Sequence, residues 1–401
     1  VDKVPTLDRL VPVERLAVTG APAIPEIGED DICFLQYTSG STSDPKGVVV
    51  THRSLRENVD ATMIHYGFDS ETTISLAWLP LYHDMGLIGF VVSTVFFGKR
   101  CILIPTLRFL KRPNVWLEAA HRHRAVVTFC PPFALPLAVR RATDEQLDAW
   151  DLSAMRVVGV GAEPINPESC RQFIDVFHAR CGLRREAVSP AYGMAEATLA
   201  MALKPVDEEF STRVVDAEAF QQRGEVVEPA TDDTPVFEHV SCGPTFPGHE
   251  MRVADVETGA WLPEGREGEL CFSGPSVTPG YYDNPEATAS CFKGPWLHTG
   301  DLGYVLDGSV YVTGRLKDLI ILNGRNLHPQ SIEWTIQDLD GVRKGNVVAF
   351  SVPGDDTELV VVALERRADY TGTDLPERVR ETLSREMSVP VADVVVLDPG
   401  L

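Results

Sequence analysis

The chain has 401 residues, of which 44% are hydrophobic, and its formal net charge is -22. This length predicts two or three domains, and the apolar content predicts a globular protein and excludes a disordered one. The acidic charge disfavours a general nucleic-acid binder, because phosphate backbones attract basic surfaces, and no apolar run reaches the length of a membrane span.

The eight cysteines show no C-x-x-C spacing, which argues against a zinc site and for reduced thiols in the core. The first residues contain no apolar segment of the kind found in signal peptides. We therefore expect a cytoplasmic protein with no nucleic-acid partner and no stable membrane insertion. Residues 1–28 are rich in proline and predict a linker. Because the chain starts without methionine, we also expect it to be an internal piece of a longer protein.

A loop rich in hydroxyl groups follows the first predicted strand. The apolar runs 32–35 and 48–50 predict two short strands on either side of it. Small residues let backbone N–H groups approach phosphate oxygens, hydroxyls donate hydrogen bonds and a lysine neutralises charge, so the loop suits a polyphosphate. Composition alone leaves a flexible surface turn as an equal alternative. The loop residues concerned are Thr38, Ser39, Gly40, Ser41, Thr42 and Lys46.

The next elements alternate between helix and strand. Apolar residues at helical spacing predict a helix over 52–66. Strands expected at 101–104 and 125–130 are separated by a helix at 116–123, and this alternation implies parallel sheets covered by helices. A further strand that starts at residue 74 runs into a turn with a lone His83-Asp84 pair. Such a pair is more often structural than catalytic.

Two predicted strands end in turns where α/β folds commonly bind ligands. The first ends in a glycine turn at 161–163, which alone indicates an ordinary strand-to-helix connection. The second ends at Tyr192, and Glu196 follows four residues later. A tyrosine there offers a face for stacking on a purine, and a carboxylate is a suitable ligand for Mg²⁺. Without other information, this second turn is also an ordinary one.

The character of the sequence changes twice after residue 204. Acidic and polar residues dominate 204–240, which predicts an insertion or a peripheral excursion, with a disordered linker as the alternative. Residues 241–313 are rich in short strands and glycine, which predicts a small distorted β-barrel. Within it Asp301 lies in a tight turn, where an aspartate usually caps backbone N–H groups. A domain boundary is expected at Gly314, and 314–401 fit a small α+β domain.

Several motifs appear in an order that resembles the adenylate-forming superfamily, whose members activate carboxylates with ATP. They are Tyr-Thr-Ser-Gly-Ser-Thr with Pro-Lys-Gly-Val (37–48), Gly-Ala-Glu-Pro (161–164), Tyr-Gly-x-x-Glu (192–196) and Thr-Gly-Asp (299–301). The segment Leu-Tyr-His-Asp-Met-Gly-Leu (81–87) is most similar to that of the fatty acyl-AMP ligases. The resemblance implies an α/β adenylate-forming fold. Its large domain, 29–313, has parallel-type sheets flanked by helices and the small barrel, and a small mobile α+β domain follows at 314–401.

The resemblance also implies a role for each candidate residue. The phosphate loop and Lys46 would hold the phosphates, Glu196 would bind Mg²⁺ and His83 would gate the acyl pocket. Asp301 would accept both ribose hydroxyls, Arg315 would bind ribose and phosphate, and Lys317 would be the hinge. The implied adenine contacts are Gly161, Ala162, Glu163, Tyr192, Gly193 and Met194.

The implied activity is that of a fatty acyl-AMP ligase with ATP and Mg²⁺, which forms an acyl-adenylate and passes the acyl group to an acyl carrier protein or a polyketide synthase carrier domain. In that family the acidic insertion restrains the C-terminal domain. The family's Ser-Gly-Lys segment with its catalytic lysine is missing after Asp398, so we expect a truncated C-terminal domain and full activity only when both ends are restored. A fatty acyl-CoA ligase and a non-catalytic binding fragment remain as alternatives.

Overall fold

The computed structural model describes residues 25–38, 45–68, 72–322, 324–354 and 358–400. Most of the predicted linker and the loop residues Ser39, Gly40, Ser41 and Thr42 lie outside these ranges. The strands on either side of the loop are present as predicted. Strand β1 (Ile32–Thr38) pairs antiparallel with β2 (Lys46–Thr51), so Thr38 and Lys46 face each other where the loop begins and ends.

A six-stranded sheet forms the centre of the large domain, in the order β4-β3-β5-β6-β7-β8. The pairs from β4 to β7 are parallel and only β7 with β8 is antiparallel, which confirms the parallel sheet expected from the alternating elements. The strands are β3 (Ile74–Ala77), β4 (Arg100–Leu103), β5 (Val127–Cys130), β6 (Val157–Val160), β7 (Val188–Gly193) and β8 (Ala200–Leu203).

Helices cover this sheet, and their ends follow capping rules. Helix α1 (His52–Tyr66) begins after Thr51, whose side chain accepts from the Ser54 N–H, and α8 (Pro167–Cys181) begins after Asn166, which caps Ser169 in the same way. The others are α2 (Asp84–Gly86), the π-helix η2 (Leu87–Val92), α3 (Ser93–Phe97), α4 (Thr106–Lys111), α5 (Val115–His123), α6 (Ala134–Arg141), α7 (Asp144–Ala149) and the short 3-10 turns η3 (Arg185–Ala187) and η4 (Ala195–Ala197).

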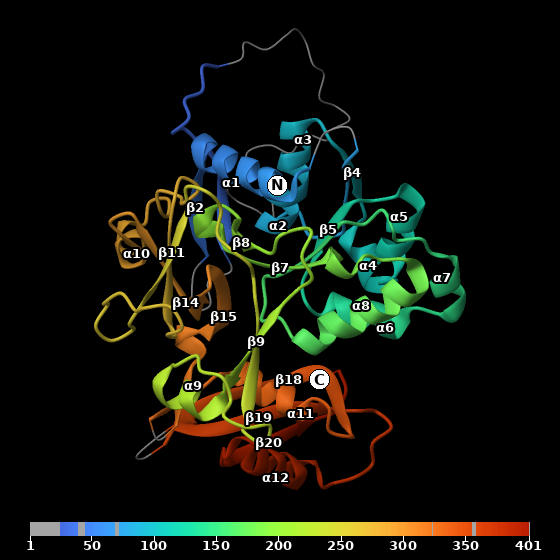
Figure 1. The fold of residues 1–401 in the computed structure, drawn as a ribbon, viewed down its shortest axis with the longest axis vertical. Helices are drawn as coiled ribbons and strands as arrows, with labels where there is room; N and C mark the ends of the chain where they lie inside the picture. The colour runs from blue at the N-terminus through green and yellow to red at the C-terminus, as the bar shows by residue number, and fades with distance from the viewer. Residues whose placement is uncertain (1–24, 39–44, 69–71, 323, 355–357, 401) are drawn as a thin grey trace, which may run out of the picture.

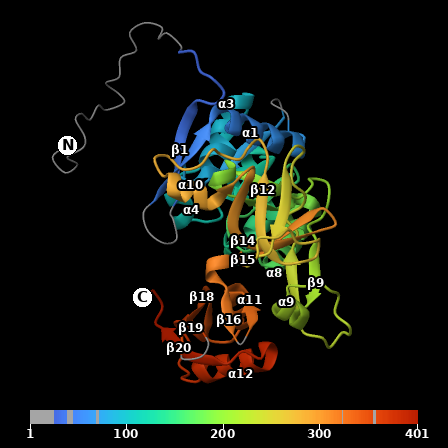
Figure 2. The same cartoon turned by 90° about the vertical axis from the view of Figure 1, so that its left-hand side faces the viewer.

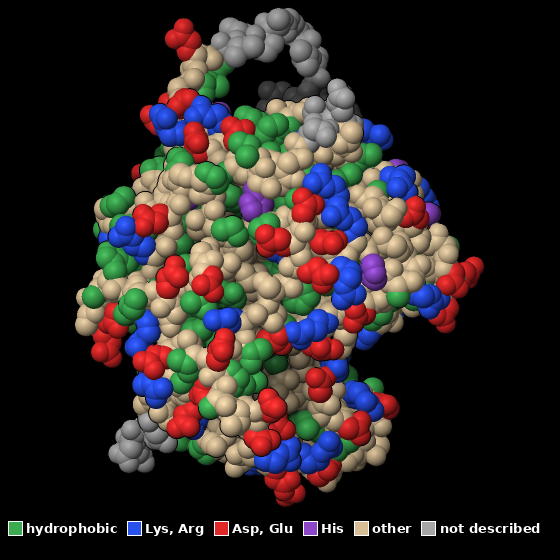
Figure 3. Space-filling view, in the orientation of Figure 1, with side chains coloured by type: hydrophobic (Ala, Val, Ile, Leu, Met, Phe, Trp, Pro, Cys, Tyr) green, Lys and Arg blue, Asp and Glu red, His purple; other side chains and the backbone are tan. Residues whose placement is uncertain are grey.

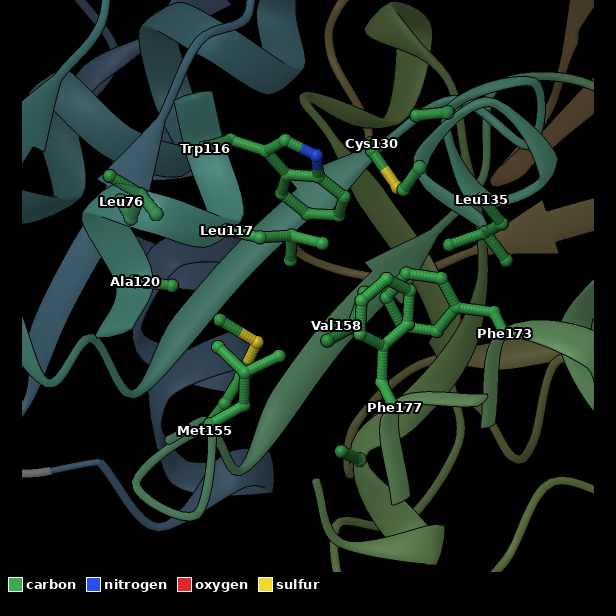
Figure 4. Packing of buried hydrophobic residues seen from close by; sticks show 14 of the residues in the cluster. Leu76, Trp116, Leu117, Ala120, Cys130, Leu135, Met155, Val158, Phe173 and Phe177 are labelled. Carbon is green, nitrogen blue, oxygen red and sulfur yellow. The ribbon is translucent and has the colours of Figure 1, made fainter. Parts of the chain in front are cut away.

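The main hydrophobic core lies between the sheet and these helices. Trp116 of α5 and Phe173 and Phe177 of α8 are completely buried (Figure 4). All eight cysteines are free thiols, and most of them are buried, which agrees with the expectation of reduced core cysteines. Among the described residues no helix combines the length and the apolar character that crossing a bilayer requires.

A second, antiparallel sheet of five strands occupies the region predicted as a small distorted barrel. Its pairings run β11-β12-β14-β13, and β15 pairs with β14, so the described strands form an open sheet. The elements are β11 (Glu250–Ala254), β12 (Gly268–Ser273), α10 (Pro285–Cys291), β13 (Phe292–Lys293), β14 (Trp296–Leu306) and β15 (Ser309–Arg315).

The acidic stretch is ordered, which excludes a disordered linker for this part of the described chain. It forms β9 (Thr212–Asp216), helix α9 (Ala217–Arg223) and β10 (Val236–Val240), and β9 pairs antiparallel with β10. Helix α9 extends to the C-terminal lobe, which both ribbon views show below the large domain (Figures 1 and 2). On the face seen in Figure 3, acidic and basic side chains are interspersed.

The C-terminal lobe has a hydrophobic core of its own, formed by residues between Ile320 and Val394. Its three-stranded sheet has the order β18-β19-β20. The elements after the 3-10 turn η5 (Leu316–Asp318) are β16 (Ile320–Leu322), β17 (Arg325–Leu327), α11 (Pro329–Ile336), β18 (Val342–Pro353), β19 (Glu358–Arg366), α12 (Leu375–Met387) and β20 (Val391–Leu397).

Candidate active site

A cavity of about 900 Å³ lies beside the carboxyl ends of β6 and β7 and extends to η5. It brings together most of the candidate residues from the sequence that the structure describes. Glu163 is the exception, since it is exposed and does not line the cavity. The candidates that do line it are Thr38, Lys46, His83, Gly161, Ala162, Tyr192, Gly193, Met194, Glu196, Asp301, Arg315 and Lys317.

Asp301 connects three elements at the polar end of the cavity. The Tyr192 hydroxyl at the end of β7 donates a hydrogen bond to Asp301 Oδ2 over 2.8 Å, and Arg315 Nε lies 3.3 Å from Oδ1. Burial raises the pKa of Asp301, while the Tyr192 hydrogen bond and the Arg315 charge oppose that rise. Burial also raises the pKa of Tyr192 well above its usual range. The phenol therefore stays a donor to Asp301 at neutral pH.

Glu196 has a partner that the sequence did not indicate. The Tyr281 hydroxyl donates to Glu196 Oε1 at 2.6 Å, and burial together with the Glu196 charge raises the pKa of Tyr281. Lys46 Nζ lies 5.1 Å from the centre of the Tyr281 ring, within the range of a cation–π contact. Tyr281 reaches this position because its neighbours Gly280 and Tyr282 form backbone hydrogen bonds with β2.

Asn58 is a second residue that sequence reasoning missed. It lies in the middle of α1, lines the cavity and is completely buried. Its Nδ2 donates to the carbonyl oxygens of Ala200 (2.7 Å) and Ala197 (3.2 Å), and its Oδ1 accepts from the Ala200 N–H (3.2 Å). These bonds hold the segment directly after Glu196 against α1. An amide side chain among the apolar residues on the buried face of a predicted helix was the available signal.

Two glycines are required by close backbone approach. A Cβ on Gly193 would lie 1.9 Å from the carbonyl oxygen of Leu199, and one on Gly161 would lie 2.7 Å from that of Ala191. Any side chain at either position would force β7 away from its neighbours, which explains why both turns are formed by glycine.

His83 lies at the mouth of the cavity, directly before α2. Its Nδ1 is 2.7 Å from Asp84 Oδ1, and this hydrogen bond raises the pKa of His83. The side chain of Gln36 in β1 donates to the carbonyl oxygen of Tyr82 at 3.0 Å and so connects the His83 turn to the strand that precedes the phosphate loop.

The other end of the cavity is mainly apolar, although Lys99 also lines it and contacts Met63 and the Phe68 ring. Side chains from α1, η2, β5 and the loop before β8 form its walls, with the Phe129 ring at one side. The apolar lining residues are Val59, Met63, Tyr66, Phe68, Ile88, Phe90, Val127, Phe129, Leu199 and Leu203.

The family model for AMP-binding enzymes matches residues 2–282. The chain belongs to the AMP-binding enzyme family. It is 38% identical over 347 residues to a Caulobacter vibrioides protein whose name is that of an acyl-CoA synthetase, covering 86% of this chain and 60% of the relative. It is 35% identical to the medium-chain-fatty-acid–[acyl-carrier-protein] ligase JamA of Moorena producens, covering 94% of this chain and 66% of the relative. The chain thus spans less than two-thirds of either relative.

This AMP-binding enzyme is also similar to a solved structure from work on fatty acyl-adenylate ligases of E. coli and L. pneumophila. The TM-score is 0.88 and the identity 34%, covering 94% of this chain and 68% of that one. The likeness confirms the adenylate-forming fold expected from the motifs.

Two side-chain contacts cross the boundary between the two lobes of this AMP-binding enzyme, and one of them involves the acidic segment. Arg325 of β17 donates to the side-chain oxygen of Gln221 in α9 at 3.0 Å. Nearby, His328 Nε2 lies 3.0 Å from Glu267 Oε1, and both side chains are about 5% exposed or less. Burial alone would raise the pKa of Glu267, but the charge of His328 and its hydrogen bond outweigh burial and lower that pKa. Lys317, in η5, lines the cavity at this boundary.

Proposed function

We propose that the protein activates a long-chain fatty acid with ATP, forming an acyl-adenylate and pyrophosphate. The observation that carries the proposal is a single cavity with charged and hydroxyl side chains at one end and mainly apolar side chains, with Lys99 among them, at the other. A nucleotide and a fatty acyl chain need these two environments side by side, with the reacting carboxylate and the α-phosphate where they meet.

Different residues at the polar end would contact the ribose, the adenine and the phosphates of ATP. Asp301 would accept from the ribose hydroxyls, with Arg315 beside it for ribose and phosphate, and Tyr192, Gly161 and Ala162 would border the adenine. Thr38 and Lys46, at the two ends of the phosphate loop, would meet the phosphates. His83, at the mouth, would gate the acyl end.

Glu196 fits the role of a magnesium ligand. Its carboxylate is buried beside the cavity and offers the hard oxygen donors that Mg²⁺ prefers, with Oε1 oriented by the Tyr281 hydroxyl. Bound Mg²⁺ would neutralise phosphate charge.

The reaction needs no covalent nucleophile from the protein. A carboxylate oxygen of the fatty acid attacks the α-phosphorus, the bond to the bridging oxygen breaks and pyrophosphate leaves. The protein would accelerate this step by holding the reactants in line and by stabilising the developing charge with Lys46 and backbone N–H groups.

For the acceptor we propose a carrier-protein thiol, either on an acyl carrier protein or on a polyketide synthase carrier domain. The name of JamA, a medium-chain-fatty-acid–[acyl-carrier-protein] ligase, supports this choice. The contact between Gln221 and Arg325 joins the acidic segment to the C-terminal lobe, as the resemblance to fatty acyl-AMP ligases implies. The name of the Caulobacter relative favours a fatty acyl-CoA ligase as the second candidate.

A product assay on the full-length protein separates the candidates. With ATP, Mg²⁺ and a long-chain fatty acid, we expect acyl-AMP to accumulate and CoA to leave it unconverted. Efficient acyl-CoA formation would favour the second candidate, and no adenylate at all would favour a non-catalytic binding protein. Glu196→Gln should abolish adenylate formation, whereas Glu250→Gln, on the exposed start of β11, should not.

A further inference from the structure

Glu269, in β12, carries a largely buried carboxylate and belongs to none of the motifs described above. Its Oε1 accepts a hydrogen bond from the Gly300 N–H at 3.0 Å, and its Oε2 lies 2.7 Å from His298 Nδ1. One carboxylate thus holds the chain on both sides of Thr299, directly before Asp301. The side chains of Glu269 and His298 are only 17% and 13% exposed.

The strand pairing explains why this turn needs such support. Glu269 pairs with Leu302 and Cys271 pairs with His298, so three residues of β14 (299–301) stand opposite the single residue Leu270. In such a bulge the backbone loses its regular ladder bonds. Thr299 Oγ1 compensates by donating to the Leu270 carbonyl (2.7 Å) and accepting from the Asp301 N–H (3.1 Å), and Glu269 provides the partner for Gly300.

We propose that Glu269 is a positioning residue for the nucleotide site, acting through the 299–301 bulge to aim the Asp301 carboxylate at the ribose. The inference rests on the proposed role of Asp301. Gly300 has a positive φ of 71°, so the bulge has a defined shape that a rigid anchor can maintain. Without the Glu269 side chain, the Asp301 carboxylate can still accept hydrogen bonds but is no longer held in one orientation.

Glu269, Cys271 and His298 also place one ligand atom each within 4.8 Å of one another, as a metal site would. One observation favours the hydrogen-bonded arrangement. The contact between Glu269 Oε2 and His298 Nδ1 occupies atoms that a cation would need.

The test measures the dissociation constants of ATP and of 2′,3′-dideoxy-ATP by calorimetry. We expect Glu269→Ala to weaken ATP binding by about tenfold or more and dideoxy-ATP binding far less, so the preference for the ribose hydroxyls collapses. Glu269→Gln keeps an acceptor for Gly300 and should retain most of the preference. The matched control is Glu264→Ala. Glu264 also accepts from a backbone N–H, that of Asp307 at 3.2 Å, but outside the cavity lining.

Asp301→Asn separates this inference from the proposed function. If Asp301→Asn leaves the preference intact, the ribose role of Asp301 is wrong. If Asp301→Asn removes the preference and Glu269→Ala does not, only the positioning role is wrong. Should Glu269→Ala fail to fold, His298→Ala removes one of the two contacts and should reduce the preference by a smaller factor; no reduction would overturn the proposal. One zinc ion per purified chain, lost in Cys271→Ser, would also overturn it.

Discussion

The two ends of the cavity are built in different ways. At the polar end, hydrogen bonds join side chains that are distant in the sequence, such as Tyr192 with Asp301 and Tyr281 with Glu196. At the apolar end, side chains such as Ile88 and Phe129 form the wall by apolar contact. The first arrangement depends on the direction of its hydrogen bonds, and the second depends on the volume of its side chains.

This difference predicts how each end responds to substitution. Removing one partner of a buried hydrogen bond leaves the other unsatisfied, whereas apolar walls tolerate exchanges that conserve volume. Changes at the polar end should therefore destroy stability or nucleotide binding. Changes at the apolar end should alter which acid is accepted.

The largest effect is expected for Gly193→Ala. The new Cβ would lie 1.9 Å from the Leu199 carbonyl oxygen, so β7 and the turn before β8 must separate. We expect a loss of about 3 kcal/mol or more in the free energy of unfolding, measured by urea denaturation. Gly89→Ala is the control, because its Cβ meets only a Leu199 methyl at 3.5 Å. Equal midpoints for the two variants would contradict the close approach.

Asn58→Ala should have the next largest effect. It removes three hydrogen bonds and leaves the backbone groups of Ala197 and Ala200 without these partners, at a cost of about 2 to 3 kcal/mol. Because the same segment carries Glu196, thermal stabilisation by ATP and Mg²⁺ should also shrink. Asn346→Ala, at a half-buried position of β18 outside the cavity lining, should change neither quantity. If ATP and Mg²⁺ raise the melting temperature of Asn58→Ala as much as that of the unsubstituted protein, the Asn58 contacts do not support the nucleotide site.

Gly159→Ala tests the apolar end. A Cβ there would lie 2.2 Å from the Phe129 ring, which must move, and Phe129 lines the cavity. If the ring moves into the cavity, shorter acids become preferred, by about fourfold in kcat/KM for each methylene no longer accommodated. Adenylate formation is compared across fatty acids of increasing length. Adding Phe129→Leu should restore the longer preference, and an unchanged profile in the single variant would exclude Phe129 as a wall of the acyl site.

The smallest effect concerns pH. The pKa of His83 is raised in the folded protein by Asp84, so the pair stabilises the fold fully below the unfolded pKa of about 6.5 and loses that contribution as pH rises through the folded pKa. Half of the His83 side chain is exposed, so solvent screening limits the gain to less than about 1 kcal/mol. The stability deficit of His83→Gln should thus shrink from pH 6 to about pH 8. A stability deficit that grows with pH would contradict the conclusion that the His83–Asp84 pair stabilises the fold more at low pH than at high pH.

Much of the local structure was predictable from the sequence, because its signals are local. The apolar runs on either side of the phosphate loop predict β1 and β2, and the helical spacing predicts α1 over the residues it occupies. Asn166 followed by Pro167 is a typical helix start, and α8 begins there. The ordered motifs then placed most candidate residues on one cavity, with Glu163 as the described exception.

The tertiary structure alone decided which partners complete the site. Tyr281 meets Glu196 because the 280–282 segment pairs with β2, and Asn58 meets Ala200 because α1 packs beside β8. Glu269 reaches Gly300 only through a bulge in the pairing of β12 with β14. Secondary-structure signals depend on neighbours within a few residues, whereas these contacts depend on strand register and helix packing over tens to more than a hundred residues. No local pattern in the sequence encodes those distances.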